Sequence, residues 1–324
     1  MKVERKFILN ISKTAGFQPD VIEKAYRIAL LLKEINNHPI LSNELVLKGG
    51  TAINFLYLPL PRLSVDLDFN FVGGITKEEM EKKREKVATH LKDIFSFLKY
   101  QVEENNEYGL HQFFLAYTNS ALNKDIVKLE INYLMRVSLL PHKDKKLKLP
   151  LFKDIETTVR TLSVEENYGG KIKALLSRGA SRDLFDVYVL LTQGPEYKKA
   201  LLRKIVIFFG CLDRSDFRDF TSHSITEITD KEIKIGLVPL LRKGVVAGRS
   251  EMIKEVKPLL ENILELRKNE EEYVKSFFKG EYAPELLFDK DEVVDLPALK
   301  NHPVALWKQQ HIKEWLEKQG RDKK

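Results

Sequence analysis

Two aspartates, spaced two positions apart and downstream of a glycine pair, are the first feature of the sequence that could carry chemistry. Asp66 and Asp68 lie in the segment 65–72, where apolar and polar residues alternate, so both carboxylates are expected on one face of a strand. Adjacent carboxylates repel each other, and a hard divalent cation such as Mg²⁺ relieves that repulsion. Gly49 and Gly50 follow a short apolar run; they let the backbone approach a ligand and leave N–H groups free at a helix start. Together these features predict a metal and phosphate site, whereas the D-x-D pair alone also fits a solvated strand face or a metal-dependent glycosyltransferase.

A third carboxylate, Glu130, falls on the polar face of another alternating segment, residues 126–133. If this strand pairs beside 65–72, Glu130 can join Asp66 and Asp68. Three carboxylates around one or two metal ions suit phosphoryl transfer, in which the metals hold a triphosphate and activate a hydroxyl nucleophile. A surface glutamate on an amphipathic strand is an equally good interpretation of this residue.

A group of cations follows further along the chain. Lys171, Arg178 and Arg182 recur at offsets of seven and four, so they share one stripe if a single helix spans them. Such a stripe suits a triphosphate, and Asp183 and Asp186 are placed to orient the cations. A ladder of salt bridges on a helix face has the same spacing, and spacing alone favours it.

A glycine pair, Gly169 and Gly170, stands just before Lys171 in the expected helix. Each glycine in a helix interior costs about 1 kcal/mol relative to alanine. Either a ligand approaches the backbone at this point, or another element packs closely against it.

Other common chemistries find little support in the sequence. The seven histidines are scattered and none forms an H-x-x-x-H pair, so zinc is not expected. Ser64 and Ser163 have no nearby histidine or glycine elbow, which argues against a hydrolase nucleophile. No G-x-x-x-x-G-K-[ST] motif occurs, which argues against a P-loop NTPase. The single cysteine, Cys211, cannot form an internal disulfide, which fits a reducing cytosol.

The elements that must position these groups change in type along the chain. Before residue 150, helices are expected over 19–35 and 76–98, helical turns over 51–58, and strands over 45–47, 65–72, 100–104, 110–118 and 125–134. Capping boxes begin the helices at Thr76 and Ser163. After the second box the apolar spacing is mostly helical. We therefore expect an α/β domain over residues 1–160 and a helical domain over residues 161–324.

Length and composition agree with two folded domains. The chain has 324 residues, of which 43% are apolar and 31% charged; this is enough for a packed core and excludes a disordered chain. The longest apolar runs are much shorter than the roughly 20 residues of a membrane span, and the N-terminus does not resemble a signal peptide. A cytoplasmic protein without membrane contact is expected.

The formal net charge of +7 is concentrated in one stretch. From Arg136 to Arg182, eleven Lys and Arg stand against five Asp and Glu, and residues 143–148 hold four lysines. On charge alone we interpret this run as a solvated loop. The motifs on either side favour a surface for phosphates, either of a nucleotide or of a nucleic acid.

Two segments of the sequence resemble the signatures of one known family. Residues 47–52 (LKGGTA) with 62–69 (RLSVDLDF), and residues 171–186 (KIKAL…R…RDLFD), are similar to the two signatures of the AbiEii/AbiGii nucleotidyltransferase toxins. A segment beginning at His302 also resembles the C-terminal part of that family. The resemblance covers about residues 20–315, and one departure from it is the glycine pair before Lys171.

The resemblance implies a fold and a set of site residues. The expected fold is α+β followed by α: a polymerase-β-like nucleotidyltransferase domain with a mixed sheet and flanking helices, then a helical domain. Asp66, Asp68, Lys171 and Asp183 would be catalytic, and Asp66 and Asp68 would hold Mg²⁺ or Mn²⁺. Glu130 is assigned as a third metal ligand from strand alternation alone. The residues expected to bind the nucleotide are Lys48, Gly49, Gly50, Thr51, Arg62, Ser64, Arg178 and Arg182.

The function implied is that of a toxin in a toxin–antitoxin pair, often serving phage defence. We expect a metal-dependent enzyme that moves NMP from an NTP to an RNA hydroxyl, in particular a tRNA 3′ end, with a cognate antitoxin as partner. Two alternatives stay open at this point. One is nucleotidylation of a small molecule or a protein, and the other is a catalytically silent module that binds RNA or a partner.

Overall fold

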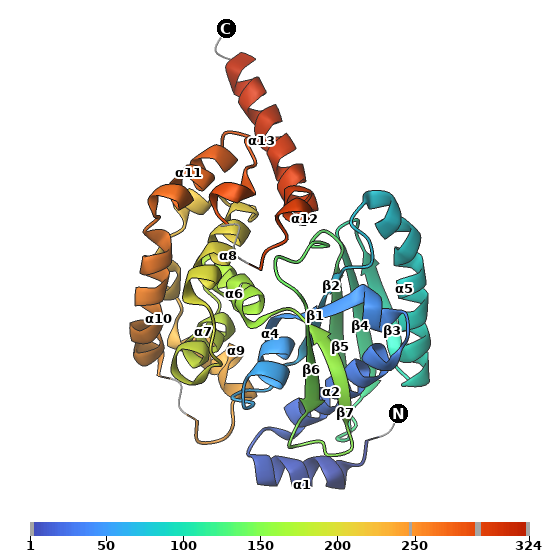
Figure 1. Cartoon of the computed structure of the whole chain (residues 1–324). Helices are drawn as coiled ribbons and strands as arrows, with labels where there is room; N and C mark the ends of the chain where they lie inside the picture. The colour runs from blue at the N-terminus through green and yellow to red at the C-terminus, as the bar shows by residue number, and fades with distance from the viewer. Residues whose placement is uncertain (1–2, 246–247, 289–292, 322–324) are drawn as a thin grey trace.

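A seven-stranded mixed sheet forms the centre of the N-terminal half (Figure 1). The computed structural model describes residues 3–245, 248–288 and 293–321. The strand order is β3-β4-β5-β2-β1-β7-β6; β2 pairs with β5 and β1 with β7 in parallel, and the other pairs are antiparallel. The strands are β1 (Leu45–Lys48), β2 (Asp66–Phe71), β3 (Gln101–Asn106), β4 (Leu110–Thr118), β5 (Lys124–Asn132), β6 (Lys143–Lys148) and β7 (Glu156–Thr161).

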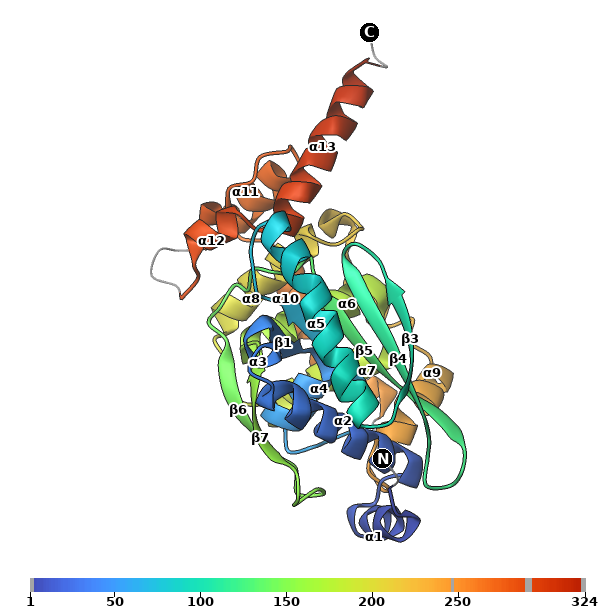
Figure 2. The same ribbon diagram turned by 90° about the vertical axis from the view of Figure 1, so that its right-hand side faces the viewer.

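Helices cover the apolar face of this sheet. The helix α2 (Pro19–Asn37) packs against β7 and β5, and α5 (Lys77–Phe97) packs against β3 and α2 (Figure 2). The helix α1 (Arg5–Ala15) packs on α2, and the single turn α3 (Leu41–Glu44) precedes β1. The expected capping box starts α5: the Thr76 hydroxyl accepts from the backbone N–H of Glu79, and the Glu79 carboxylate accepts from that of Thr76.

The opposite face of β2 carries Asp66, Asp68 and Asn70, and it faces the helical part of the chain. Between β1 and β2 the chain forms the short helix α4 (Gly49–Ala52) and one π-helical segment, η1 (Ile53–Tyr57). The helix α4 contacts both β2 and α6. This connection therefore joins the sheet to the helices at the point where the glycine pair lies.

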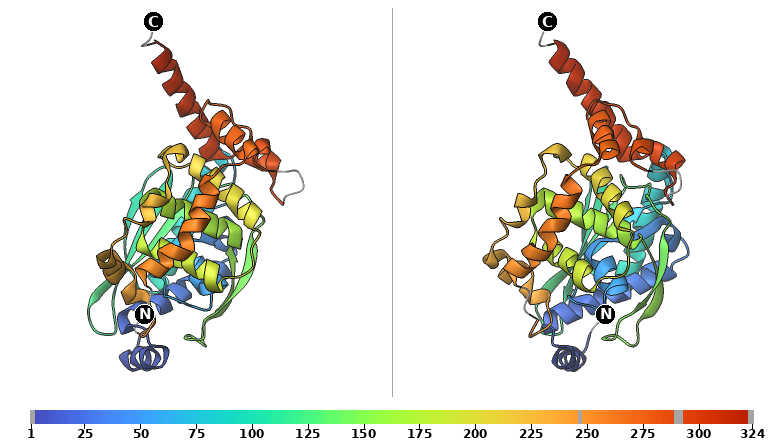
Figure 3. Two further views of the ribbon diagram at one scale, coloured as in Figure 1. Left: turned by 90° about the vertical axis from the view of Figure 1, so that its left-hand side faces the viewer. Right: turned by 60° about the vertical axis from the view of Figure 1, so that its left-hand side comes forward.

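Helices make up the C-terminal half, with short 3₁₀ turns between them (Figure 3). The helix α8 packs along α6, and α13 projects from the body of the molecule toward the C-terminus. The helices are α6 (Val164–Arg178), α7 (Ser181–Gln193), α8 (Lys199–Cys211), α9 (Asp230–Gly236), α10 (Arg249–Leu264), α11 (Lys268–Phe277), α12 (Leu296–Lys300) and α13 (Pro303–Arg321).

Two buried apolar clusters correspond to the two halves. One lies between the sheet and the helices α2 and α5, and the other lies among the C-terminal helices. Four residues of the N-terminal half, Ile53, Leu58, Leu139 and Leu140, pack in the second cluster. A boundary between separate domains near residue 160 stays a prediction. Among the described helices, none is both long and apolar enough to cross a membrane.

The expected fold class is confirmed, with two local corrections. The lysine-rich run 143–148 is not a loop but the edge strand β6, which pairs with β7, a strand not expected from the sequence. The condition for a shared stripe of Lys171, Arg178 and Arg182 is not met, because the helix that carries Lys171 does not continue to Arg182. It ends at Arg178, because Gly179 adopts a left-handed conformation (φ +59°) and caps the helix, and Arg182 lies on α7.

Candidate active site

The glycine pair at the end of β1 lies against the side chains of both signatures. Gly49 has φ +72°, a conformation that favours glycine, and a Cβ there would stand 2.8 Å from Oδ2 of Asp68. A Cβ on Gly50 would stand 2.9 Å from Nη2 of Arg62 and 3.8 Å from Nζ of Lys171. Glycine at both positions therefore lets the Asp68 carboxylate and the Arg62 guanidinium approach the backbone this closely, whereas Lys171 would be in ordinary contact with a Cβ.

The carboxylates lie on neighbouring strands, and we call Asp66, Asp68 and Glu130 the sheet wall of the site. In the parallel pair β2–β5, Asp68 stands opposite Glu130 and Asp66 opposite Lys128. Burial raises the pKa of Asp68, and the charges of Glu130 and Asp66 add to the rise, while Lys48 and Lys171 oppose it. The pairing of β2 with β5 meets the condition under which Glu130 can lie beside Asp66 and Asp68.

The remaining contacts of the sheet wall are few. Nη1 of Arg182 lies 3.6 Å from Oδ2 of Asp66, whose side chain is 41% exposed. Glu130 accepts a hydrogen bond from Gln112 (2.6 Å) and pairs with Lys128 (3.0 Å). Arg182 thus reaches the sheet from α7, although it does not share a helix with Lys171.

The donor set of the sheet wall fits a divalent cation in part. Asp66 and Asp68 present hard oxygen ligands from one face of β2, as Mg²⁺ prefers. Across the described residues, however, no three Asp, Glu, His or Cys side chains are already arranged to hold a metal ion. Glu130 is directed to Gln112 and Lys128 instead, so its role as third ligand stays a prediction.

The opposite side, which we call the helical wall, is a dense network of ion pairs. Nζ of Lys171 lies 2.7 Å from Oδ1 of Asp183 and 3.3 Å from Oδ2 of Asp186. Arg178 forms a bidentate contact with Asp183 (2.7 and 3.0 Å). Although burial acts in the opposite direction, the cations lower the pKa of both aspartates, so both are ionised at neutral pH.

Arg62 ties the first signature to this network. Its guanidinium donates two hydrogen bonds to Asp186, both of 2.7 Å, and both side chains are buried. The Thr51 hydroxyl lies 2.8 Å from Oγ of Ser64 and also contacts the carbonyl of Asp66. Arg62, Thr51 and Ser64 therefore hold the start of β2 and the pair Gly49–Gly50, which we call the glycine turn, in place. Direct contact with a nucleotide stays a prediction for each of these three residues.

A cavity of about 450 Å³ is lined by residues of both walls, although Asp66 and Glu130 of the sheet wall do not line it. The residues lining it include Asp68 from the sheet wall, Asp183 from the helical wall, and Lys48, Lys171, Lys173 and Arg178. Four cationic side chains and two aspartates thus surround the same space. This arrangement suits a polyanionic ligand that carries a metal ion. Of the helix glycines, Gly170 borders the cavity, whereas Gly169 is needed for packing, since its Cβ would stand 2.4 Å from Cγ2 of Ile205.

Several residues of the site were missed from the sequence. Asn167 accepts the backbone N–H of Gly49 (3.0 Å), and Asn54 donates to the carbonyl of Gly50 (2.9 Å), so two amides fix the glycine turn. The only sequence signal for Asn167 was its position one helical turn before Lys171. Glu166 also lines the cavity; burial raises its pKa to about 7, although two backbone N–H groups bind its carboxylate.

Comparison with known proteins places the chain in a family and a fold. The model of the AbiEii family, described as nucleotidyl transferase toxins of type IV toxin–antitoxin systems, matches residues 30–270. The structure is similar to that of MenT4, a nucleotidyltransferase toxin from Mycobacterium tuberculosis H37Rv, with a TM-score of 0.64 at 15% identity. That similarity covers 94% of this chain and 99% of MenT4. No curated protein sequence matches the chain.

Proposed function

We propose that this chain, which belongs to the AbiEii family of nucleotidyl transferase toxins of type IV toxin–antitoxin systems, transfers NMP from an NTP to an RNA hydroxyl with a divalent metal ion. One observation carries the proposal. The carboxylate of Asp68 approaches Gly49, the ammonium of Lys171 approaches Gly50, and both side chains line the same cavity. Carboxylates suited to a metal ion and cations suited to phosphates thus line one space large enough for a nucleotide.

The cationic face would bind the triphosphate. Lys171 is held by Asp183 and Asp186, and its ammonium is placed to neutralise charge on the departing pyrophosphate. Lys48 and Arg178 add positive charge to the same cavity. The backbone of Gly49 and Gly50 would lie against the phosphates because neither residue has a side chain.

The anionic face would hold Mg²⁺ or Mn²⁺. Asp66 and Asp68 are the proposed ligands, and Glu130 would complete the set after leaving Gln112 and Lys128. When bound, such an ion neutralises phosphate charge and lowers the pKa of an attacking hydroxyl. The carboxylates themselves orient the substrates and hold the cation beside the glycine turn.

RNA, in particular a tRNA 3′ end, is the proposed acceptor, and a cognate antitoxin is the proposed partner. The basic strand β6 supports a nucleic acid: Lys143 and Lys145 line a hollow beside Tyr57, and Nζ of Lys145 lies 5.0 Å from the centre of the Tyr57 ring. Lysines beside an aromatic ring are typical of RNA-binding surfaces.

The test is incubation of the purified chain with each labelled NTP and total RNA, with and without EDTA. We expect label to enter RNA with one NTP or a few, and EDTA to stop the transfer. Transfer that continues in excess EDTA would contradict the metal, and label on protein or small molecules alone would contradict the RNA acceptor.

A further inference from the structure

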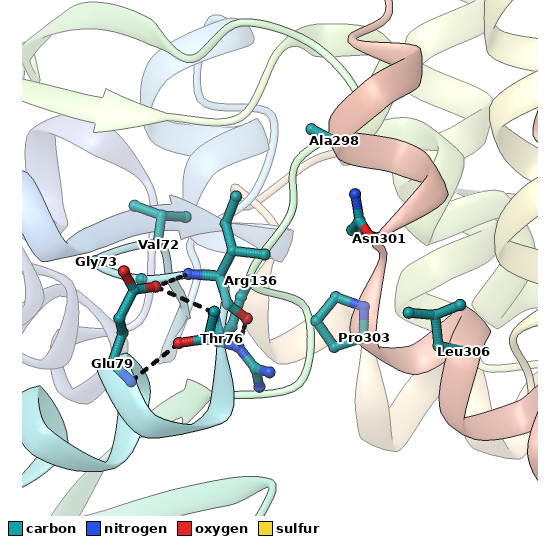
Figure 4. Close-up of a pocket in the computed structure, with 11 residues that line it drawn as sticks. Val72, Gly73, Thr76, Glu79, Arg136, Ala298, Asn301, Pro303 and Leu306 are labelled. Carbon is teal, nitrogen blue, oxygen red and sulfur yellow. Dashed lines mark hydrogen bonds between the residues drawn. The ribbon is translucent and has the colours of Figure 1, made fainter.

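A second hollow, outside the active-site cavity, lies between the sheet and the last two helices. It measures about 740 Å³. The turn after β2 and Arg136 form one wall, and α12 with the start of α13 forms the other (Figure 4). The two spaces are adjacent: Met135 and Val304 line the active-site cavity, and their chain neighbours Arg136 and Pro303 line the hollow. The hollow and the active-site cavity therefore lie next to each other along the chain at both of these points.

The side chain of Arg136 is the unusual group in this hollow. The residue is only 7% exposed. Its Nε donates to the carbonyl of Ile75 (3.0 Å) and its Nη1 to that of Tyr133 (2.6 Å), but it forms no ion pair within the described part of the chain. A buried charge without a counter-ion is costly, so the guanidinium is poised for an anion that a ligand brings.

The other groups of the hollow do not supply that anion. Glu79 lies in the same wall, but its carboxylate accepts from the backbone N–H groups of Ile75 and Thr76 (3.0 and 3.1 Å), so the start of α5 already stabilises its charge. On the opposite wall, the first turn of α13 contains no acidic residue. Pro303 has no N–H, and the N–H groups of Ala305 and Leu306 bind His302, so the positive end of the α13 dipole, rather than free donors, adds to the potential beside Arg136.

A polar track leads from the catalytic carboxylates to this hollow. Asp68 and Asn70 lie on the same face of β2, about 6.6 Å apart along the strand, and Val72 follows directly after the last residue of that strand, Phe71. Asn70 lines the active-site cavity, and Val72 lines the hollow. Asn70 is only 3% exposed, and its Oδ1 has no hydrogen-bond partner in the described structure. A free buried amide can donate and accept, as contact with a base or a ribose requires.

We propose that this hollow is the acceptor subsite: the 3′ end of the RNA lies along Asp68, Asn70 and Val72, and Arg136 binds one of its backbone phosphates. The inference rests on the proposed function and adds where the acceptor lies. The triphosphate of the NTP would be bound on the other side, by Lys48 and Lys171. The two phosphate-binding groups therefore serve different substrates.

The test compares two charge insertions on one helix. Leu306 is 46% exposed at the rim of the hollow, and Leu316 is 39% exposed further along α13, outside it. Binding of a 5′-fluorescent single-stranded oligoribonucleotide with a 3′ hydroxyl is measured by anisotropy without NTP, and KM values are measured in the transfer assay. Leu306→Glu should weaken RNA binding about tenfold and raise the KM for RNA, without changing the KM for NTP. Leu316→Glu should bind RNA as the wild type does.

Arg136→Gln provides a second, independent readout. Removal of one phosphate-binding charge should flatten the log–log salt dependence of RNA binding by about 0.7. If this variant does not fold, Leu306→Glu alone decides. Equal RNA binding by Leu306→Glu and Leu316→Glu, or an effect on the KM for NTP only, would overturn the inference. If the wild type still transfers label to RNA in that case, the proposed function stands. A wild type that labels no RNA would overturn both.

Discussion

The sheet wall of the active site carries carboxylates with few partners, whereas the helical wall carries aspartates whose ion pairs are nearly saturated. Asp66 is 41% exposed with one distant arginine, and Asp183 is 1% exposed between Lys171 and Arg178. Correspondingly, the pKa of Asp68 is raised and that of Asp183 is lowered. The ion pairs of the helical wall are thus complete without substrate, while the carboxylates of the sheet wall are only partly neutralised, as the proposed metal ion would require.

The largest effect is expected on the sheet wall. Asp66→Ala and Asp68→Ala should each lower transfer about a thousandfold or more, because a metal contributes several kcal/mol to stabilisation of the transition state. The fold should survive, as neither carboxylate is a partner in a buried ion pair. Transfer is measured per folded molecule, and Asp230→Ala at the exposed start of α9 serves as control. Wild-type turnover in either variant would show that the pair only solvates its strand.

The next largest effect is expected at Lys171 on the helical wall. Lys171→Ala should lose activity by about 10²–10³-fold, since removal of one preorganised charge at a transition state has that effect. Lys171→Arg should lose less, because it keeps the charge but not the shape. The control is Lys254→Ala on α10. If Lys171→Ala lowers the melting temperature and leaves turnover per folded molecule intact, the residue is structural.

Stability should distinguish the two walls most clearly at Asp186. Asp186→Ala removes the partner of buried Arg62, and breaking one half of a buried pair costs about 3–5 kcal/mol. The free energy of unfolding in urea measures this change. Glu271→Ala, which breaks an exposed pair with Lys275, is the control and should change stability far less. Similar effects of both substitutions would mean that the helical wall is no more fixed than the surface.

The helical half should lose stability in acid because it buries the neutral side chain of His302. Burial lowers the pKa of His302 to about 3. The folded pKa lies below the unfolded value of about 6.5. The contribution of neutral His302 to the free energy of unfolding is therefore fully present above pH 6.5, and it is lost as the pH falls toward 3, at about 1.4 kcal/mol per pH unit. His302→Asn keeps an acceptor for the N–H of Ala305 and should lose less stability on acidification. His223→Asn at an exposed position is the control, and identical acid profiles for wild type and His302→Asn would contradict the assignment.

The smallest effect is expected from the lysines of β6. Neutralising Lys143, Lys145, Lys146 and Lys148 should weaken RNA binding and flatten its salt dependence, by about 0.7 in log–log slope for each lysine that binds a phosphate of single-stranded RNA. Affinity for NTP should barely change, because β6 is separated from β2 by two strands. Unchanged RNA affinity and an unchanged salt dependence of binding would show that these lysines only solvate the edge of the sheet.

Local patterns in the sequence were enough to predict much of the sheet wall. Alternation placed Asp66 and Asp68 on one face, and the capping box at Thr76 fixed the start of α5. Strand β6 was missed because only Leu147 in the run 143–148 is apolar, and its pairing with β7 depends on distant residues. The β-branched residues of 157–161 were the signal that could have found β7.

The helical wall was much less predictable. Its essential contacts join residues far apart in the chain: Arg62 and Asp186 are separated by 124 positions, and Gly49 and Asn167 by 118. Spacing also suggested one stripe for Lys171 and Arg182, and Gly179 breaks it. Sequence patterns identify residues on one element, but the packing of elements decides which of them meet.

The most direct test of a sheet wall completed by a cation is the thermal stability of wild type and Asp68→Asn, with and without Mg²⁺ and each NTP. Without ligand, Asp68→Asn should be at least as stable as wild type at pH 8, because the buried carboxylate with a raised pKa disfavours the folded state once it ionises. With Mg²⁺ and the correct NTP, wild type should gain about 2.7 kcal/mol at a hundredfold excess over Kd, and Asp68→Asn should gain far less. Equal stabilisation of both proteins by Mg²⁺ and NTP, or a marked loss of stability in unliganded Asp68→Asn, would contradict this role of the sheet wall.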